Sequence, residues 1–400
     1  MSLWDYIFRR LINFFYNLKN FELTIPKIKR KGVFRMALYD ITDPFSVCFN
    51  MMKIKYSDYD EYLTNANFLN LHDKVNIFIN LETVFKYLSM INDLEKKLIL
   101  QKKFDVILVS NIINLAAHYK RFFMGNGFDT RVYLYHTDFN SKRFIQRKYN
   151  EDYRLYYLLK YNDNPKFVYL TDSLKSRILK EVKAICEFIP RVYYISGLDI
   201  EGSEIPYVIG NEDSTRKNII LSGEFYDTQY SLIPNYFISY FHSSIGYRAI
   251  CNNIKDCLKE ITKRKDSELD SFVNTYNNYG MYCSLLSVLG DRSRSIDGLT
   301  GIGPKILEKT ILQGLSRNEL KLTTNNPELI GNIFHDNEMK TEFINNYYCS
   351  SIVSGYDELM DSHKLSIFNQ RKDRLDVDSL VKLNATRFNS YPLILEILTQ

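Results

Sequence analysis

The chain has 400 residues, 45% of them hydrophobic and 25% charged, which is enough for one large or two moderate domains with their own cores. Its net charge of +5 is compatible with nucleic-acid binding but does not indicate it alone. No apolar run approaches the roughly 20 residues that a membrane-spanning helix needs, so no such segment is expected. The abundance of Tyr, Phe, Asn, Ile and Lys is typical of AT-rich genomes, viral ones included.

The six cysteines are scattered, and neither a C-x-x-C pair nor a Cys/His cluster with zinc spacing occurs among them. This usage is typical of a reduced, intracellular protein, located in the cytoplasm or nucleoid of a host, with the virion as an alternative. The apolar N-terminus carries charges and lacks a small-residue cleavage site, so it does not resemble a signal peptide.

Residues 2–19 place apolar side chains, including the only tryptophan, Trp4, at helical spacing, with Arg9 and Arg10 on the opposite side. This amphipathic helix either packs on the body of the protein or docks a protein partner through residues 1–20. A short basic run, Pro26–Lys31, follows it. We assign residues 1–70 to an N-terminal helical module.

An alternation of apolar runs and helical patterns begins at residue 75. It predicts a parallel sheet with crossover helices in a domain spanning residues 71–235, so the fold class is α/β. Ligands of such sheets bind beyond the carboxyl ends of the strands. The expected strands are 75–81, 104–109, 131–135, 192–195 and 218–221, and the expected helices are 82–100, 111–125 and 174–188.

Strand signals thin out after residue 235, and residues 236–400 read as mostly helical. Within this region, Gly301 and Gly303 flank one apolar residue, and Pro304 and Lys305 then open an amphipathic run. Glycines allow positive φ and leave the backbone amides bare, while proline suits the first turn of a helix. A helix N-terminus of this kind binds phosphate, and Lys305 adds a charge; the alternative is an ordinary connection with glycines for clearance.

The stretch 290–305 also resembles the helix-hairpin-helix region of the 5′-nuclease family, which includes flap endonucleases and bacterial and phage 5′→3′ exonucleases. The residues that match the family pattern are Gly290, Asp291, Ser293, Ile296, Gly298, Gly301, Ile302, Gly303, Pro304 and Lys305. The resemblance implies a PIN-like, flap-endonuclease-like sheet, then a helical region with the hairpin at 290–312, and a viral or phage source. It also implies DNA contacts by Gly301, Gly303 and Lys305.

A basic, aromatic segment at 139–149 is similar to the family's phosphate-binding run. The resemblance implies that Arg143, Lys148 and Tyr149 bind DNA, the cations meeting phosphates and the aromatic ring stacking on a base. The alternative is a charged helix that faces solvent.

Members of this family cut DNA with Mg²⁺ ions held by converging carboxylates. The acids that the resemblance retains as catalytic and metal-binding residues are Glu201, Glu204, Glu224 and Asp291. Four other expected carboxylates are replaced, by Asn80, Ser203, Tyr226 and Arg294. Asp227 stands one place from an expected acid, and Glu82 and Asp199 are further substitutes. An arginine near the cluster opposes a dication, so the site reads as degenerate, holding either one weakly bound Mg²⁺ or none.

The sequence therefore favours a catalytically impaired 5′-nuclease-like protein that binds duplex, flap or single-stranded DNA through its backbone. Such a protein would be a subunit or accessory factor in viral or phage DNA replication, transcription or packaging. Two alternatives stay open: an active Mg²⁺-dependent 5′→3′ exonuclease or flap endonuclease, and a structural interaction subunit without DNA binding.

Overall fold

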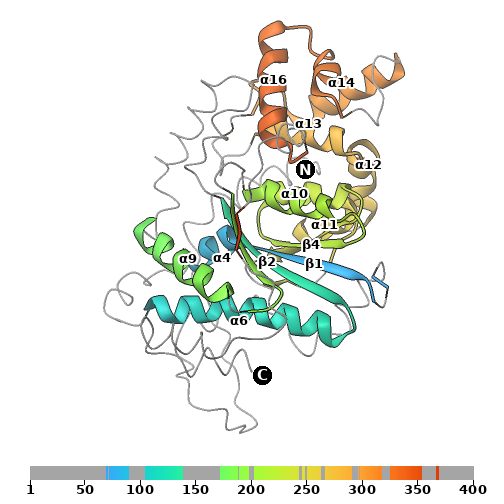
Figure 1. Cartoon of the computed structure of the whole chain (residues 1–400). Coiled ribbons are helices and arrows are strands. Elements are labelled where there is room, and N and C mark those ends of the chain that lie inside the picture. Colours follow the sequence, from blue (N-terminus) through green and yellow to red (C-terminus); the bar gives the residue numbers. More distant parts are fainter. Residues whose placement is uncertain are drawn as a thin grey trace, which may run out of the picture.

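A computed structural model describes residues 69–70, 72–89, 104–137, 172–187, 189–197, 202–242, 246–247, 250–262, 266–290, 296, 298–317, 325–353 and 366–368 (Figure 1). The strands are β1 (Lys74–Asn80), β2 (Asp129–Thr137), β3 (Val192–Gly197), β4 (Lys217–Ser222), β5 (Tyr236–His242), β6 (Gly246–Tyr247) and β7 (Ser366–Phe368). The helices are α4 (Leu81–Ser89), α6 (Phe104–Gly125), α9 (Asp172–Cys186), α10 (Ile205–Glu212), α11 (Ile254–Thr262), α12 (Asp266–Tyr276), α13 (Tyr279–Leu289), α14 (Pro304–Ser316), α15 (Pro327–Gly331) and α16 (Asn337–Ser350), with the 3-10 helices η4 (Gly202–Glu204) and η5 (Phe225–Leu232).

The strands form one sheet in the order β6-β5-β4-β1-β2-β3-β7. The five central strands are parallel, and β6 and β7 pair antiparallel at the two ends. Because helices link the parallel strands, the predicted α/β fold with crossover helices is confirmed. The helical elements α11 to α16 follow β1 to β6 in the chain, and β7 comes after them.

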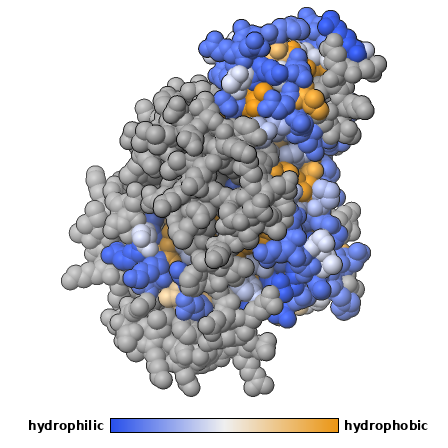
Figure 2. Space-filling model, turned by 45° about the horizontal axis from the view of Figure 1, so that its top comes forward, coloured by the Kyte–Doolittle hydropathy of each residue, from blue (hydrophilic) through white to orange (hydrophobic). Residues whose placement is uncertain are grey.

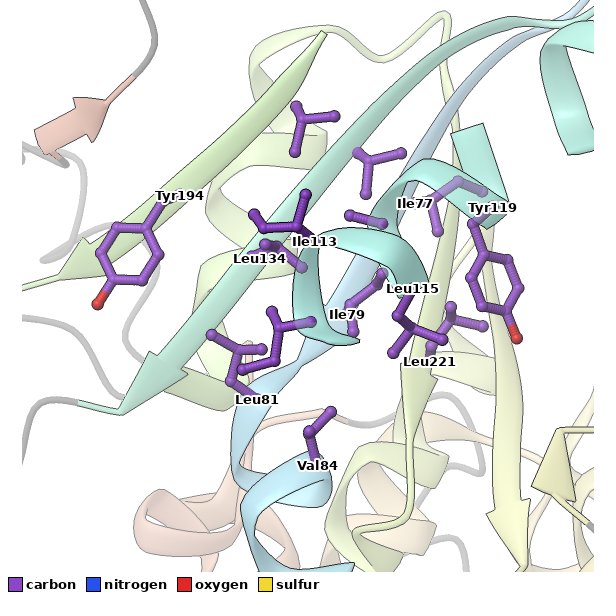
Figure 3. Close-up of a cluster of buried hydrophobic side chains, with 14 of the residues drawn as sticks. Ile77, Ile79, Leu81, Val84, Ile113, Leu115, Tyr119, Leu134, Tyr194 and Leu221 are labelled. Carbon is purple, nitrogen blue, oxygen red and sulfur yellow. The ribbon is translucent and has the colours of Figure 1, made fainter. Parts of the chain in front are cut away.

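Successive side chains of a strand point to opposite faces of the sheet, so the strands contribute to two separate hydrophobic cores. On one face, Ile77, Ile79, Leu134 and Leu221 pack against α4, α6 and α9 (Figure 3). On the other face, aromatic strand residues pack against α10 and η5 in a second cluster. The sheet is therefore buried on both faces, as its nearly continuous apolar strands require.

The predicted strand at residues 104–109 is wrong, since these residues form the first turns of α6. Leu108, Val109, Ile112 and Ile113 are all buried, so the run belongs to the apolar side of one long helix. A short continuous apolar run does not distinguish a buried strand from a buried helix. The helix expected from residue 111 is the rest of the same element.

The expected domain boundary at residue 235 does not hold, because β5 begins at Tyr236 and pairs with β4 along its length. The run from Tyr236 to His242 is rich in aromatic and β-branched residues, which favour strands. The sheet also gains β7, at residues 366–368. Residues 236–400, which the sequence assigned to the helical region alone, therefore also contribute strands to the sheet.

The helical region is joined to the sheet through a fully buried glutamine of η5, Gln229. Its Nε2 donates to the carbonyls of Tyr226 (2.9 Å) and Ser350 (3.0 Å). Its Oε1 accepts from the Tyr279 hydroxyl (2.5 Å) and from the backbone N–H of Ile352 (3.0 Å). One side chain thus connects η5 with the start of α13 and the end of α16.

The expected N-terminal module lies outside the described residues, apart from positions 69 and 70. Of the helices in the described ranges, none is long and apolar enough to cross a bilayer.

Candidate functional site

The carboxyl ends of β1 and β4 lie side by side, because the two strands are parallel neighbours with Ile79 opposite Leu221. The last residue of β1 is Asn80 and the last residue of β4 is Ser222, and both are buried. This is the edge at which ligands of parallel sheets bind. As expected, an amide stands here at the end of β1 where the 5′-nuclease resemblance would place a carboxylate.

Asp227 of η5 points into this edge and is fully buried. Its Oδ2 accepts hydrogen bonds from Ser222 Oγ (2.5 Å) and from Asn80 Nδ2 (3.2 Å). The sequence left the direction of this side chain open, one place from the expected acid. The structure brings it into contact with both strand ends.

Backbone donors fix the surroundings of this carboxylate. Asn80 Oδ1 accepts from the N–H groups of Glu82 (2.9 Å) and Thr83 (3.4 Å), at the start of α4. The Gly223 N–H donates to Thr83 Oγ1 (2.9 Å), and the Glu224 N–H donates to Ser222 Oγ (3.1 Å). We call the side chains of Asn80, Thr83, Ser222 and Asp227 the edge network. They close the gap between the two strand ends with neutral donors around one acid.

Two of the four predicted acids, Glu204 and Glu224, lie in the described part of the chain. Glu204 is 1% exposed and follows Ser203, whose carbonyl accepts from the Tyr230 hydroxyl of η5 (2.5 Å). Glu224 is half-buried at the start of η5. Glu204 therefore lies in η4, which follows β3, and Glu224 lies between β4 and η5.

Glu82, a further substitute ligand, lies in the first turn of α4 and faces Lys175 of α9 at 3.8 Å. Both side chains are 22% exposed, so the pair is mostly shielded from water. The Lys175 ammonium also lies 5.8 Å from the centre of the Phe85 ring. A protein cation therefore already faces this carboxylate.

The described residues do not fit a two-metal Mg²⁺ site. Within the described ranges, no three His, Cys, Asp or Glu side chains lie close enough to hold a metal ion. Oxygen ligands of Mg²⁺ need free lone pairs in near-octahedral geometry, whereas Asp227 Oδ2 already accepts two hydrogen bonds. Glu201 and Asp291 lie outside the described residues, so the four-acid set stays a prediction.

The glycine turn before α14 has the expected form. Gly301 has φ of +79°, which favours glycine, and a Cβ there would meet nothing within 4 Å. Gly303 has φ of −96° and caps α14, so of the two glycines that allow a positive φ only Gly301 adopts one. Its carbonyl accepts from the N–H groups of Ile306 and Leu307 at 3.0 Å. Because Gly303 has no side chain, it leaves the N-terminus of α14 uncovered.

A third glycine explains how this turn is held on the body of the protein. A Cβ at Gly298 would lie 2.5 Å from the Val288 carbonyl oxygen, which also accepts from the Leu299 N–H at 3.0 Å. Only glycine lets the chain pass so close to the end of α13. Gly301 and Lys305 are exposed. The upper end of the molecule in Figure 2 shows hydrophilic surface around small apolar patches.

The remaining DNA-binding candidates, Arg143, Lys148 and Tyr149, lie outside the described residues. Asp138 directly follows the last residue of β2, the strand next to β1, and it lies outside the described ranges.

No protein-family model matches the chain, and no curated protein is similar to it in sequence. Among solved structures, it is similar to the bacteriophage T5 flap endonuclease in a pseudo-enzyme–product complex with DNA and metal ions, at 17% identity and a TM-score of 0.40, covering 81% of this chain and 100% of that chain. A second T5 structure, co-crystallised with metal ions, has 16% identity and a TM-score of 0.41, with coverages of 81% and 99%. The catalytic core of Rad2 in complex with DNA has 10% identity and a TM-score of 0.40, with coverages of 89% and 97%. Likeness at this level does not assign a family or an activity to the chain.

Proposed function

We propose that this protein is a 5′-nuclease-like protein that binds the phosphate backbone of DNA and does not cut it efficiently. In this proposal it serves as a subunit or accessory factor in viral or phage DNA replication, transcription or packaging. The observation that carries the proposal is the bonding of Asp227, whose Oδ2 accepts hydrogen bonds from Ser222 and Asn80 at the edge where metals would have to bind.

The proposed DNA contact is the N-terminus of α14. Gly301 and Gly303 leave its approach open, and Lys305 is exposed beside it. A phosphate at this end is favoured by the helix dipole and by the lysine charge. Contacts of this type position a duplex without reading its sequence, so the expected binding is non-specific.

Binding to a 5′-flap duplex is expected to weaken by about tenfold or more between about 50 and 200 mM salt, because each phosphate contact releases counterions. Lys305→Ala is expected to lower the slope of log affinity against log salt by about one, for all DNA sequences tested. The measurement is fluorescence anisotropy with a labelled flap at several salt concentrations.

Arg317→Ala is the matched control, since Arg317 is exposed and ends α14, about 18 Å from Lys305 along the helix axis. It removes the same charge far from the proposed phosphate and is expected to change the salt slope much less. If no binding is found at low salt, or both variants behave alike, the DNA contact at this turn is refuted. Absence of all DNA binding would favour an interaction subunit instead.

A second candidate function, metal-dependent 5′ cleavage, is favoured by the presence of Glu204 and Asp227 in the 3-10 helices that follow β3 and β4. Our proposal expects no cleavage of a 5′-flap substrate above background with Mg²⁺ or Mn²⁺, measured on denaturing gels. Cleavage that is abolished by Asp227→Asn or Asp291→Asn would establish the second candidate in place of the first.

A further inference from the structure

The edge network contains a fully buried carboxylate, that of Asp227, which lies between two strand ends. A buried ionised group is costly unless it is paired and hydrogen-bonded. Around Asp227 Oδ2, the two donors that the structure places are Ser222 Oγ and Asn80 Nδ2, and both are uncharged. These two groups therefore compensate one of the two oxygens of the Asp227 carboxylate.

The orientation of the Asn80 amide is not arbitrary. Its Oδ1 faces the N–H groups of Glu82 and Thr83, which can only donate. The other end of the amide, Nδ2, must then face Ser222 and Asp227, as it does. An aspartate at position 80 could still accept from the two N–H groups, but it would have no proton to give Asp227.

The Ser222 hydroxyl is constrained in a similar way. It accepts from the Glu224 N–H at 3.1 Å, and its single proton is directed to Asp227 at 2.5 Å. Thr83 Oγ1 lies 3.4 Å from it and accepts from the Gly223 N–H. The hydrogen bonds of Asn80, Thr83 and Ser222 are thus oriented so that Asp227 is the acceptor at the centre of the edge network.

We infer that Asn80 and Ser222 take the place of a divalent cation at this edge, holding Asp227 with neutral hydrogen-bond donors. This deepens the proposed function, on which it rests, because it gives the physical reason for the loss of cleavage. The strand ends are joined by direct hydrogen bonds in place of shared metal ligands. The inference assigns Asn80 a positioning role and makes it the residue that decides whether the edge accepts a cation.

Asn80→Asp tests this directly. It would place a second carboxylate oxygen near Asp227, at about the present 3.2 Å separation of Nδ2 and Oδ2. Like charges this close disfavour each other unless a proton or cation is shared. In EDTA the variant is expected to melt about 5 °C or more below the wild type, and Mn²⁺ at constant ionic strength is expected to recover at least half of that loss.

The exchange variant Asn80→Asp with Asp227→Asn keeps one carboxylate and one amide but swaps their positions. Its melting temperature is expected to lie within about 2 °C of the wild type in EDTA, with no response to Mn²⁺. Asn76→Asp is the control for a new buried acid elsewhere. Asn76 is on the same strand and is buried, and its Oδ1 accepts from Arg216 at 3.4 Å, so a new acid there faces a protein cation and is expected to show no Mn²⁺ response.

The readout is thermal unfolding, with Mn²⁺ or Mg²⁺ as the probe, and it does not depend on DNA. An Asn80→Asp variant that Mn²⁺ fails to stabilise, or an exchange variant as unstable as the single one, overturns the inference and leaves the proposed DNA binding intact. A wild-type melting temperature that Mn²⁺ raises, in a manner lost in Asp227→Asn, also overturns the inference, whereas only cleavage of the flap substrate or absence of DNA binding overturns the proposed function. If Asn80→Asp does not fold, the wild-type titration and the exchange variant still decide.

Discussion

Arg216→Met is expected to lower the free energy of unfolding by about 1–3 kcal/mol, because it removes a buried cation that donates to two partly exposed carboxylates and to backbone carbonyls. Arg216 is 2% exposed, and its guanidinium lies 2.8 Å from Asp129 and 3.3 Å from Asp213. It also donates to the carbonyls of Asp129 (3.1 Å) and Val75 (3.4 Å). The side chain therefore ties together the amino ends of β1, β2 and β4, opposite the edge network.

Arg191→Ala is the matched control, because Arg191 pairs with the same Asp129 but is exposed. Exposed pairs contribute about 0–1 kcal/mol, so this variant is expected to lose no more than that. Urea unfolding of both variants at pH 7 gives the comparison. If both variants lost the same unfolding free energy, the burial of Arg216 would not be what makes its hydrogen bonds and ion pairs stronger than those of Arg191.

The same network predicts the response to acid. Burial raises the pKa of Asp129, but Arg216 and then Arg191 lower it more, so the net shift is downward from 3.8. A carboxyl with a lowered folded pKa stabilises the protein above its unfolded pKa, and that stability is lost as pH falls through the folded value. The stability difference between wild type and Arg216→Met should accordingly shrink below about pH 4.

The strands of the sheet centre could be predicted because their apolar runs are short and end in polar residues. Lys74–Asn80 and Lys217–Ser222 are such runs, and both strands lie where the sequence placed them. The start of α6 could not, since Asp105 is the one polar residue at positions 104–109 and a single position does not reveal the helical period. β5 was missed because its aromatic residues continue directly from the loop after η5.

At the candidate site, the sequence located the strand ends correctly and identified Asn80 as a neutral substitute. It could not decide the direction of Asp227, because a turn residue one place out of register can face either way. That direction depends on how the next residues pack. The Thr228 hydroxyl lies 2.7 Å from the Tyr282 hydroxyl of α13, and Gln229 bonds to α13 and the end of α16. These partners are distant in sequence, so no local pattern reveals them.

Gln229→Leu is expected to cost about 4 kcal/mol or more of unfolding free energy. Leucine has a similar size but leaves several buried groups without their partner, each costing about 1–3 kcal/mol. The groups concerned are the Ser350 carbonyl, the Ile352 N–H and the Tyr279 hydroxyl. Urea unfolding measures the loss, and hydrogen exchange at the Ile352 amide locates it at the junction.

Gln313→Leu provides the control, since Gln313 is an exposed glutamine of α14 and its replacement is expected to change stability by no more than about 0.5 kcal/mol. A Gln229→Leu variant as stable as this control would show that the junction is held by apolar packing alone. The expected loss has a consequence for the site, because Asp227 and Gln229 are two residues apart in η5. Hydrogen bonds to the strand ends and to the helical region act on the same 3-10 helix, so loosening one end of η5 should also loosen the edge network at the other.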